Sequence, residues 1–97
     1  MSNESVDSVD EAESLEESLI RRIGSGDNGA EGQLVTHYRR GLYLILRREC
    51  GDADLAEDLT QDTLEKVIMN AREGKIHKPR ALAGYIRQLG IYQLIDL

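Results

Sequence analysis

Apolar residues recur three and four positions apart through most of this 97-residue chain, and this spacing constrains the fold more than any other feature. Alternation of apolar and polar residues, which marks a half-buried strand, never lasts more than a few residues. We therefore expect helices over about residues 11–23, 28–50, 54–73 and 80–97. The sequence predicts an all-α protein, a small bundle of about four helices.

Residues that start and stop helices stand at the expected boundaries. Asn28, with Glu31 three residues later, has the spacing of a capping box for the second helix. The apolar stripe of the first helix comprises Leu15, Leu19, Ile20 and Ile23. The other boundary signals are Gly51, Asp52 or Asp54, Gly74 and Pro79.

The formal net charge of −6 comes from the amino-terminal end of the chain. Residues 1–18 hold seven acids and no base, whereas the remainder carries a net charge of +1. A segment with so few apolar residues cannot bury enough surface to offset the entropy of ordering. We expect residues 1–13 to form an acidic tail, disordered over at least residues 1–10, and residues 14–97 to form one domain.

Several classes of protein are excluded by what the sequence lacks. His37, Cys50 and His77 do not have the spacing of metal ligands, and no arrangement typical of a catalytic nucleophile occurs. We therefore expect no enzyme activity and no cofactor. No secretory signal and no apolar run long enough to span a membrane are present, and one cysteine suits a reducing compartment. These features predict a cytoplasmic protein without membrane insertion.

The charges of the body are segregated along the chain. Residues 49–65 hold seven acids and no base, and residues 66–97 hold six bases and two acids. On the third predicted helix, one face about 140° wide collects Asp54, Glu57, Asp58, Gln61, Asp62 and Glu65. A solvated face is one interpretation of this pattern. A surface for a basic partner is the other, because no cation within the acidic run relieves the repulsion.

Three ordered segments resemble region 2 of the ECF (extracytoplasmic function) type of bacterial RNA polymerase sigma factor. Gly51-Asp52 and the LAEDLTQDTL run of residues 55–64 are similar to the family's GD and AEDL-Q-E signature. Residues 26–47 resemble the segment before it, and residues 85–96 resemble the helix written W-L-x-x-I-A-x-N-x-x-x-D. Tyr85, Gly90 and Tyr92 stand where the family usually has Trp, Ala and Asn.

The resemblance implies that the acidic face docks on the coiled coil of the polymerase β′ subunit. A surface of one charge sign gains steering and register from a partner of the opposite sign. The implied polymerase-binding residues are Glu57, Asp58, Gln61, Asp62 and Glu65.

The resemblance also implies that the basic loop near residues 75–80 and the helix after it melt the −10 promoter element and read it as single-stranded DNA. Cationic side chains neutralise phosphates, tyrosines offer stacking surfaces, and glutamines read base edges. The implied DNA-binding residues are Lys75, His77, Lys78, Arg80, Tyr85, Arg87, Gln88, Tyr92 and Gln93.

Competing interpretations exist for several of these residues. Tyr85 shares an apolar stripe with Leu82 and Leu89, so a core position competes with a stacking role. His77 is also explained as a plain exposed loop residue, and the basic residues as a general solvated surface. The arginine pairs at 39–40 and 47–48 either contact the DNA backbone or pair with the acidic face of the third helix, and we favour the ion pairs.

Two other functions compete with a sigma factor. A sigma mimic has the same fold and binds an anti-sigma factor without binding DNA, and a general helical adaptor would make the signature match a coincidence. An anti-sigma factor is an expected partner in the sigma-factor interpretation too. We expect the chain to be a fragment, because the family continues into a basic stretch and a second helical domain that reads the −35 element.

Overall fold

The structure, a computed structural model, describes residues 12–96 and contains four α-helices and one 3-10 turn. The elements are α2 (Leu15–Gly24), α3 (Asn28–Cys50), α4 (Ala53–Arg72), η1 (Pro79–Ala81) and α5 (Leu82–Ile95). Between residues 12 and 96 there is no strand. The prediction of an all-α bundle of about four helices is confirmed.

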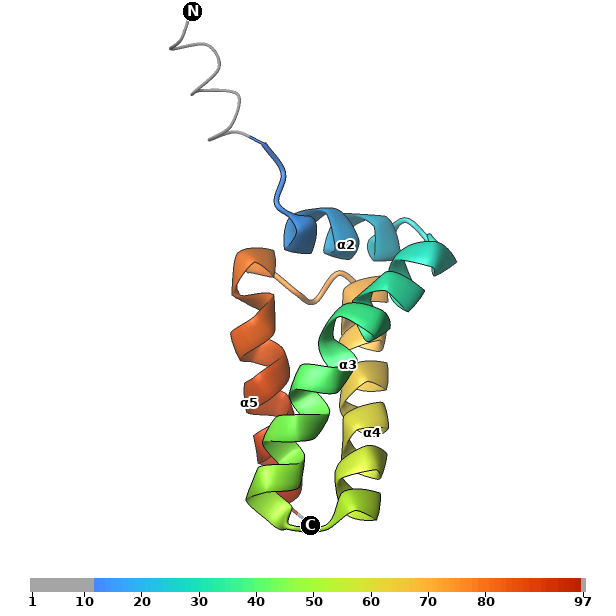
Figure 1. Ribbon diagram of the computed structural model, residues 1–97. Helices are drawn as coiled ribbons and strands as arrows, with labels where there is room; N and C mark the ends of the chain where they lie inside the picture. Colours follow the sequence, from blue (N-terminus) through green and yellow to red (C-terminus); the bar gives the residue numbers. More distant parts are fainter. Residues whose placement is uncertain (1–11, 97) are drawn as a thin grey trace, which may run out of the picture.

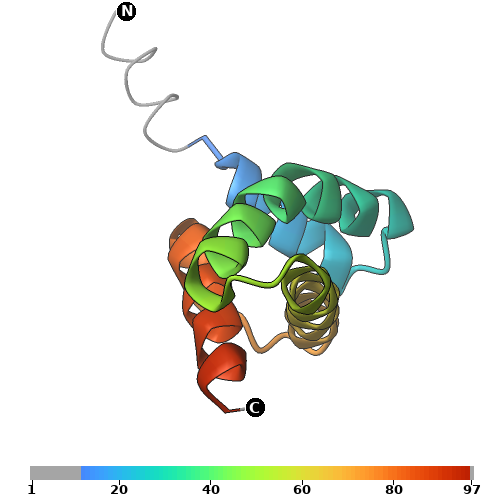
Figure 2. The ribbon, with the colours of Figure 1, turned by 60° about the horizontal axis from the view of Figure 1, so that its bottom comes forward.

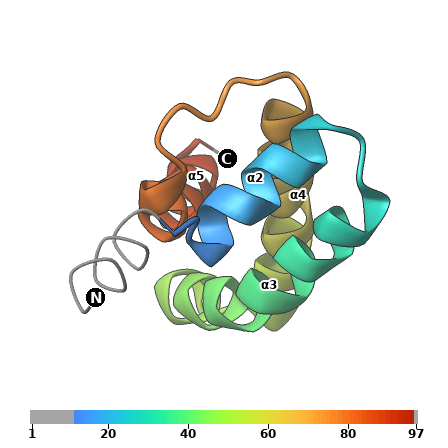
Figure 3. The ribbon, with the colours of Figure 1, turned by 90° about the horizontal axis from the view of Figure 1, so that it is seen from above.

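Helices α3, α4 and α5 lie side by side, and α2 crosses one end of them (Figure 1). Helix α4 runs antiparallel to its two neighbours and contacts both, and α3 also contacts α5 (Figure 2). Seen from the other end, α2 covers the ends of the long helices and touches η1 (Figure 3). Three helices therefore form the bundle, and the fourth closes it at the end where the loop leading to α5 begins.

Side-chain caps set three of the helix starts, and two of them correct the sequence prediction. Helix α2 begins at Leu15 rather than near residue 11, because Ser14 and Glu17 form a reciprocal capping box. The predicted Asn28 cap of α3 is wrong: Asp27 caps Ala30 instead. Of the two candidates for α4, Asp52 is the cap, and its carboxylate accepts from the Leu55 N–H at 3.1 Å.

The helix ends follow the glycines that the sequence marked. Gly51, with φ of 72°, ends α3, and Gly74, with φ of 71°, follows the last turn of α4. Both adopt the left-handed conformation that a side chain disfavours. Pro79 opens η1, so the last helix begins at Leu82, two residues later than expected.

The core is built where the four apolar stripes meet. Its fully buried large residues include Leu19, Ile23, Leu34, Leu46 and Leu82. Leu15, predicted to share the buried stripe of the first helix, is 49% exposed. Within α5, Gly90 faces α3 so closely that an added Cβ would lie 2.9 Å from the Leu42 side chain.

Part of the acidic tail is outside the described residues. The predicted disorder of residues 1–10 falls there, whereas Glu13, also assigned to the tail, forms an ion pair with Arg21 at 2.7 Å. None of the described helices combines the length and the apolar character needed to cross a membrane.

Candidate functional site

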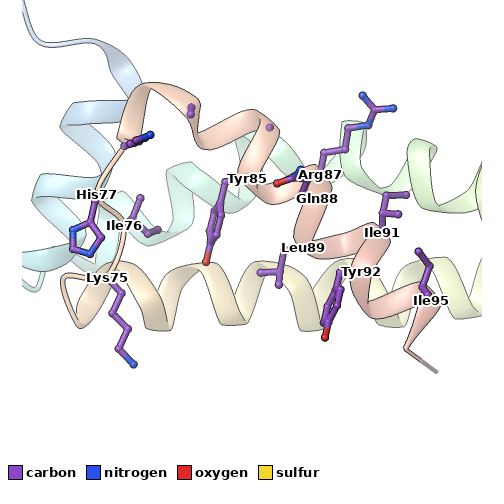
Figure 4. Close-up of a pocket in the computed structure, with 13 residues that line it drawn as sticks. Lys75, Ile76, His77, Tyr85, Arg87, Gln88, Leu89, Ile91, Tyr92 and Ile95 are labelled. Carbon is purple, nitrogen blue, oxygen red and sulfur yellow. The ribbon is translucent and has the colours of Figure 1, made fainter.

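An open groove with a volume of about 1140 Å³ runs along the loop of residues 75–78 and helix α5 (Figure 4). Its lining mixes cationic, aromatic and amide side chains with aliphatic ones. Seven of the nine predicted DNA-binding residues line it: Lys75, His77, Lys78, Tyr85, Arg87, Gln88 and Tyr92. The fold thus brings most of this set to one surface, and Arg80 and Gln93 lie outside the lining.

The loop wall of the groove is anchored at both ends. At its start, Gly74 reverses the chain, and the Lys75 N–H donates to the Asn70 carbonyl at 2.8 Å. At its end, the Arg80 guanidinium in η1 pairs with the Glu17 carboxylate of α2 at 3.2 Å. Glu17 also belongs to the capping box of α2, and the hydrogen bonds from Ser14 and Arg80 lower its pKa. Helix α2 therefore anchors the end of the loop.

The cationic side chains of the groove differ in whether they already form an ion pair within the protein. The Lys75 ammonium pairs with Glu73 at 2.9 Å, and this carboxylate raises the pKa of the lysine. Lys78 and Arg87 are exposed and make no ion pair with any described residue. Figure 4 shows Arg87 extending from the side of α5 opposite to Tyr85. Lys78 and Arg87 are thus the groove cations most available to phosphate groups.

The two tyrosines of the groove are held differently. Tyr85 is half-buried, and its hydroxyl accepts a hydrogen bond from the Asn70 amide of α4 at 2.6 Å. Tyr92 is 64% exposed. Tyr85 packs against the core as a partly buried residue, and its ring also lines the groove, so its stacking role stays a prediction.

Gln93 has a different environment from the other predicted DNA-binding residues. Its amide nitrogen donates to the Thr63 hydroxyl, and its amide oxygen accepts from the Lys66 ammonium. Both partners belong to α4, so Gln93 links α4 to α5. A role of Gln93 in reading bases stays a prediction. It would require Gln93 to break its hydrogen bonds to Thr63 and Lys66 and to form new ones to a base.

The acidic face lies on α4, and its side chains do not line the groove. Asp58, Gln61, Asp62 and Glu65 are exposed, and no described residue forms an ion pair with the three acids. Glu57 is half-buried and pairs with Arg39 of α3 at 3.1 Å. The exposed, unpaired part of the face is therefore the part centred on Asp58 and Asp62.

The arginines at positions 39–40 and 47–48 of α3 differ in whether they form an ion pair. Arg39 forms the predicted ion pair with the acidic face, through Glu57. Arg40, Arg47 and Arg48 are exposed and form no ion pair within the described part of the chain. The favoured interpretation is therefore confirmed for one arginine of the four.

Residues 34–97 match the family model described as sigma-70 region 2. The match covers about two thirds of the chain and includes both the acidic face and the groove. This chain belongs to the sigma-70 region 2 family. Comparison with curated proteins and with solved structures gives no match. Sigma-70 region 2 domains are non-enzymatic, and the family identifies RNA polymerase and promoter DNA as their partners.

The sigma region 2 groove also contains residues that the sequence reasoning missed. Ile76, Leu89, Ile91 and Ile95 supply its apolar lining, and Asn70 holds Tyr85 without lining the groove itself. The three apolar residues of α5 had a detectable signal, because they lie on the helix that the resemblance implicated, whereas Ile76 lies in the loop before it. Asn70 had none, because its partner is on another helix, 15 positions away.

Proposed function

We propose that this chain is the region 2 domain of an ECF-type sigma factor and acts in the cytoplasm in transcription initiation. Its acidic face would dock on the β′ coiled coil of RNA polymerase, while its groove would bind the −10 element as single-stranded DNA. The observation that carries the proposal is the groove itself, because cations, tyrosines and an exposed amide all line it in a sigma-70 region 2 domain.

The chemistry of the groove suits a single strand. Lys78 and Arg87 provide free positive charge for phosphates, and Tyr85 and Tyr92 provide surfaces on which unpaired bases stack. Gln88 is exposed and carries both a donor and an acceptor for a base edge. The aliphatic lining between these groups favours bases that have left the duplex, because a stacked duplex buries its base faces.

The acidic face supports the polymerase part of the proposal. Asp58, Asp62 and Glu65 lie exposed without cationic partners among the described residues, which costs stability through mutual repulsion. A basic partner relieves that repulsion and fixes the register of docking. Glu57 is the least available acid of this set, because Arg39 already pairs with it.

A pull-down with purified core RNA polymerase tests the docking. We expect the wild-type chain to bind and Asp62→Lys to lose about 2 kcal/mol of binding free energy, roughly a 30-fold loss of affinity. Glu49→Lys is the matched control, because Glu49 is an exposed acid of α3 outside the proposed surface. Equal retention of core enzyme by the Asp62→Lys and wild-type chains would refute the assignment.

A sigma mimic that binds an anti-sigma factor without DNA is the second candidate. The feature that favours it is Tyr92, whose large exposed ring occupies the position where the family usually has Asn. Binding to core polymerase and to single-stranded DNA separates the two candidates, because a mimic would show neither. An anti-sigma factor is a proposed partner under both.

A further inference from the structure

The Tyr85 ring crosses from α5 to α4, where its hydroxyl is fixed. The Asn70 amide donates to this hydroxyl at 2.6 Å, and Figure 4 shows the ring extending toward α4 with its oxygen at the far end. Asn70 is one of three α4 residues that bond to α5, the others being Thr63 and Lys66, which both contact Gln93. Of these three, Asn70 alone contacts a residue that lines the groove.

The groove therefore offers one restrained ring and one free ring. Tyr85 is half-buried and hydrogen-bonded, whereas Tyr92 is 64% exposed and its hydroxyl bonds to no described residue. A side chain already held in its bound orientation loses little rotamer entropy when a ligand stacks on it. The restrained ring is consequently the better platform for the first base that enters the groove.

We propose that Asn70 is a positioning residue for this groove: by holding the Tyr85 hydroxyl, it fixes the ring as a stacking surface for an unpaired nucleobase. This inference rests on the proposed binding of single-stranded DNA. Asn70 does not line the groove, so its effect passes through Tyr85 rather than through contact with the DNA. The partner it serves is the flat face of a base, and this role requires no particular base identity.

A double-mutant cycle on the full chain tests the inference. The variants are Asn70→Leu, Tyr85→Phe and the double variant, and the ligand is a labelled oligothymidylate. Its affinity is measured by fluorescence anisotropy, and quenching of tyrosine emission reports stacking in a chain that has four Tyr and no Trp. Thr60→Val is the matched control, because it removes a buried side-chain hydrogen bond of α4, to the Ala56 carbonyl, that involves neither Tyr85 nor Gln93. Thermal unfolding verifies that each variant is folded.

We expect Asn70→Leu to weaken oligothymidylate binding by about threefold to tenfold and to reduce the quenching, because stacking on a loosened ring costs more entropy. In the Tyr85→Phe background, Asn70→Leu should change nothing further, and Thr60→Val should bind as the wild type does. Equal effects of Asn70→Leu in both backgrounds, or no effect in either, would overturn the positioning role alone. A folded wild-type chain that does not bind the oligonucleotide would overturn the proposed DNA binding, and this inference with it.

Discussion

Tyr38 and Tyr85 differ in how the fold treats their hydroxyl groups. The Tyr85 hydroxyl accepts a bond from Asn70, whereas the Tyr38 hydroxyl is buried and has no hydrogen-bond partner within residues 12–96. Burial raises the pKa of Tyr38, and the Glu16 carboxylate adds to the effect. A buried polar group without a partner costs free energy, whereas a bonded one contributes a modest net stabilisation. The two residues thus allow the effect of a bonded and of an unbonded tyrosine hydroxyl on stability to be compared in one protein.

Tyr38→Phe should leave the free energy of unfolding unchanged or raise it by up to about 1 kcal/mol, because it removes an unsatisfied hydroxyl. Tyr85→Phe should lower it by about 1 kcal/mol, because Asn70 then loses its acceptor. Urea denaturation of both variants measures the difference. A larger loss from Tyr38→Phe than from Tyr85→Phe would contradict the hydrogen bonding described here.

The family resemblance pointed to most of the residues that line the groove, and tertiary contacts explain what it did not predict. The lysines, tyrosines and Gln88 could be identified because the resemblance placed them on one loop and one helix. The pairing of Arg80 with Glu17 and of Tyr85 with Asn70 could not, because each joins residues on different elements. Gln93 was expected among the DNA-binding residues, but its hydrogen bonds to α4 depend on how the helices pack.

At the scale of elements, turn and cap residues determine where helices begin and end. Ser14 and Asp27 were missed as caps because several acids and polar residues compete near each start, and only the backbone geometry selects one. Gly51 and Gly74 were identified correctly, because a left-handed residue at a helix end favours glycine strongly. Helix existence was therefore easier to predict than helix starts.

Two glycines of the α3 region should respond to alanine in opposite directions. Gly41 lies within α3, and an added Cβ there meets nothing within 4 Å, so Gly41→Ala should stabilise the fold by about 0.5–1 kcal/mol. Gly51 has φ of 72°, so Gly51→Ala should destabilise it by about 1 kcal/mol. Thermal unfolding measures both, and a shift of the same sign in the two variants would contradict the backbone assignment.

An ion pair between elements makes stability depend on pH. The Arg72 guanidinium of α4 holds Glu31 of α3 in two hydrogen bonds of 2.6 Å and lowers its pKa below the ordinary value of 4.5. A carboxyl with a lowered folded-state pKa stabilises the fold above its unfolded pKa, and this stabilisation is lost as the pH falls through the folded pKa.

Glu31→Gln should therefore lower stability near neutral pH and make the loss of stability below about pH 4.5 less steep. Urea unfolding at a series of pH values measures this, with wild type as the reference. If the free energy of unfolding depended on pH in the same way in both proteins, the Glu31–Arg72 ion pair would not contribute to the pH dependence of stability.

At the scale of the whole molecule, the net charge of −6 conceals two surfaces of opposite character. The unpaired acids of the acidic face lie on α4, and the free cations of the groove lie on the loop and α5. This separation allows a single small domain to meet a basic protein surface and a nucleic acid together. A net negative charge would by itself argue against binding to nucleic acid, because phosphates repel acids, whereas the positions of the charges support it.

The groove cations should contribute to binding of single-stranded DNA without affecting the docking of the acidic face on polymerase. Lys78→Glu with Arg87→Glu should weaken binding to single-stranded DNA, and the slope of log affinity against log salt should fall by about 0.7 for each phosphate that the variant no longer neutralises. Retention of core polymerase should not change. Titrations at several salt concentrations measure the slope, and an unaltered slope would remove these cations from the DNA-binding surface.

Photo-crosslinking in a complex of the chain with core RNA polymerase and promoter DNA tests the two-surface account most directly. A diazirine amino acid replaces Gln61 on α4 in one variant and Gln88 on α5 in another, so both probes occupy exposed glutamine positions. We predict that the probe at position 61 labels the β′ subunit and that the probe at position 88 labels the single-stranded −10 region. Labelling of DNA from position 61, or of polymerase alone from position 88, would contradict the account.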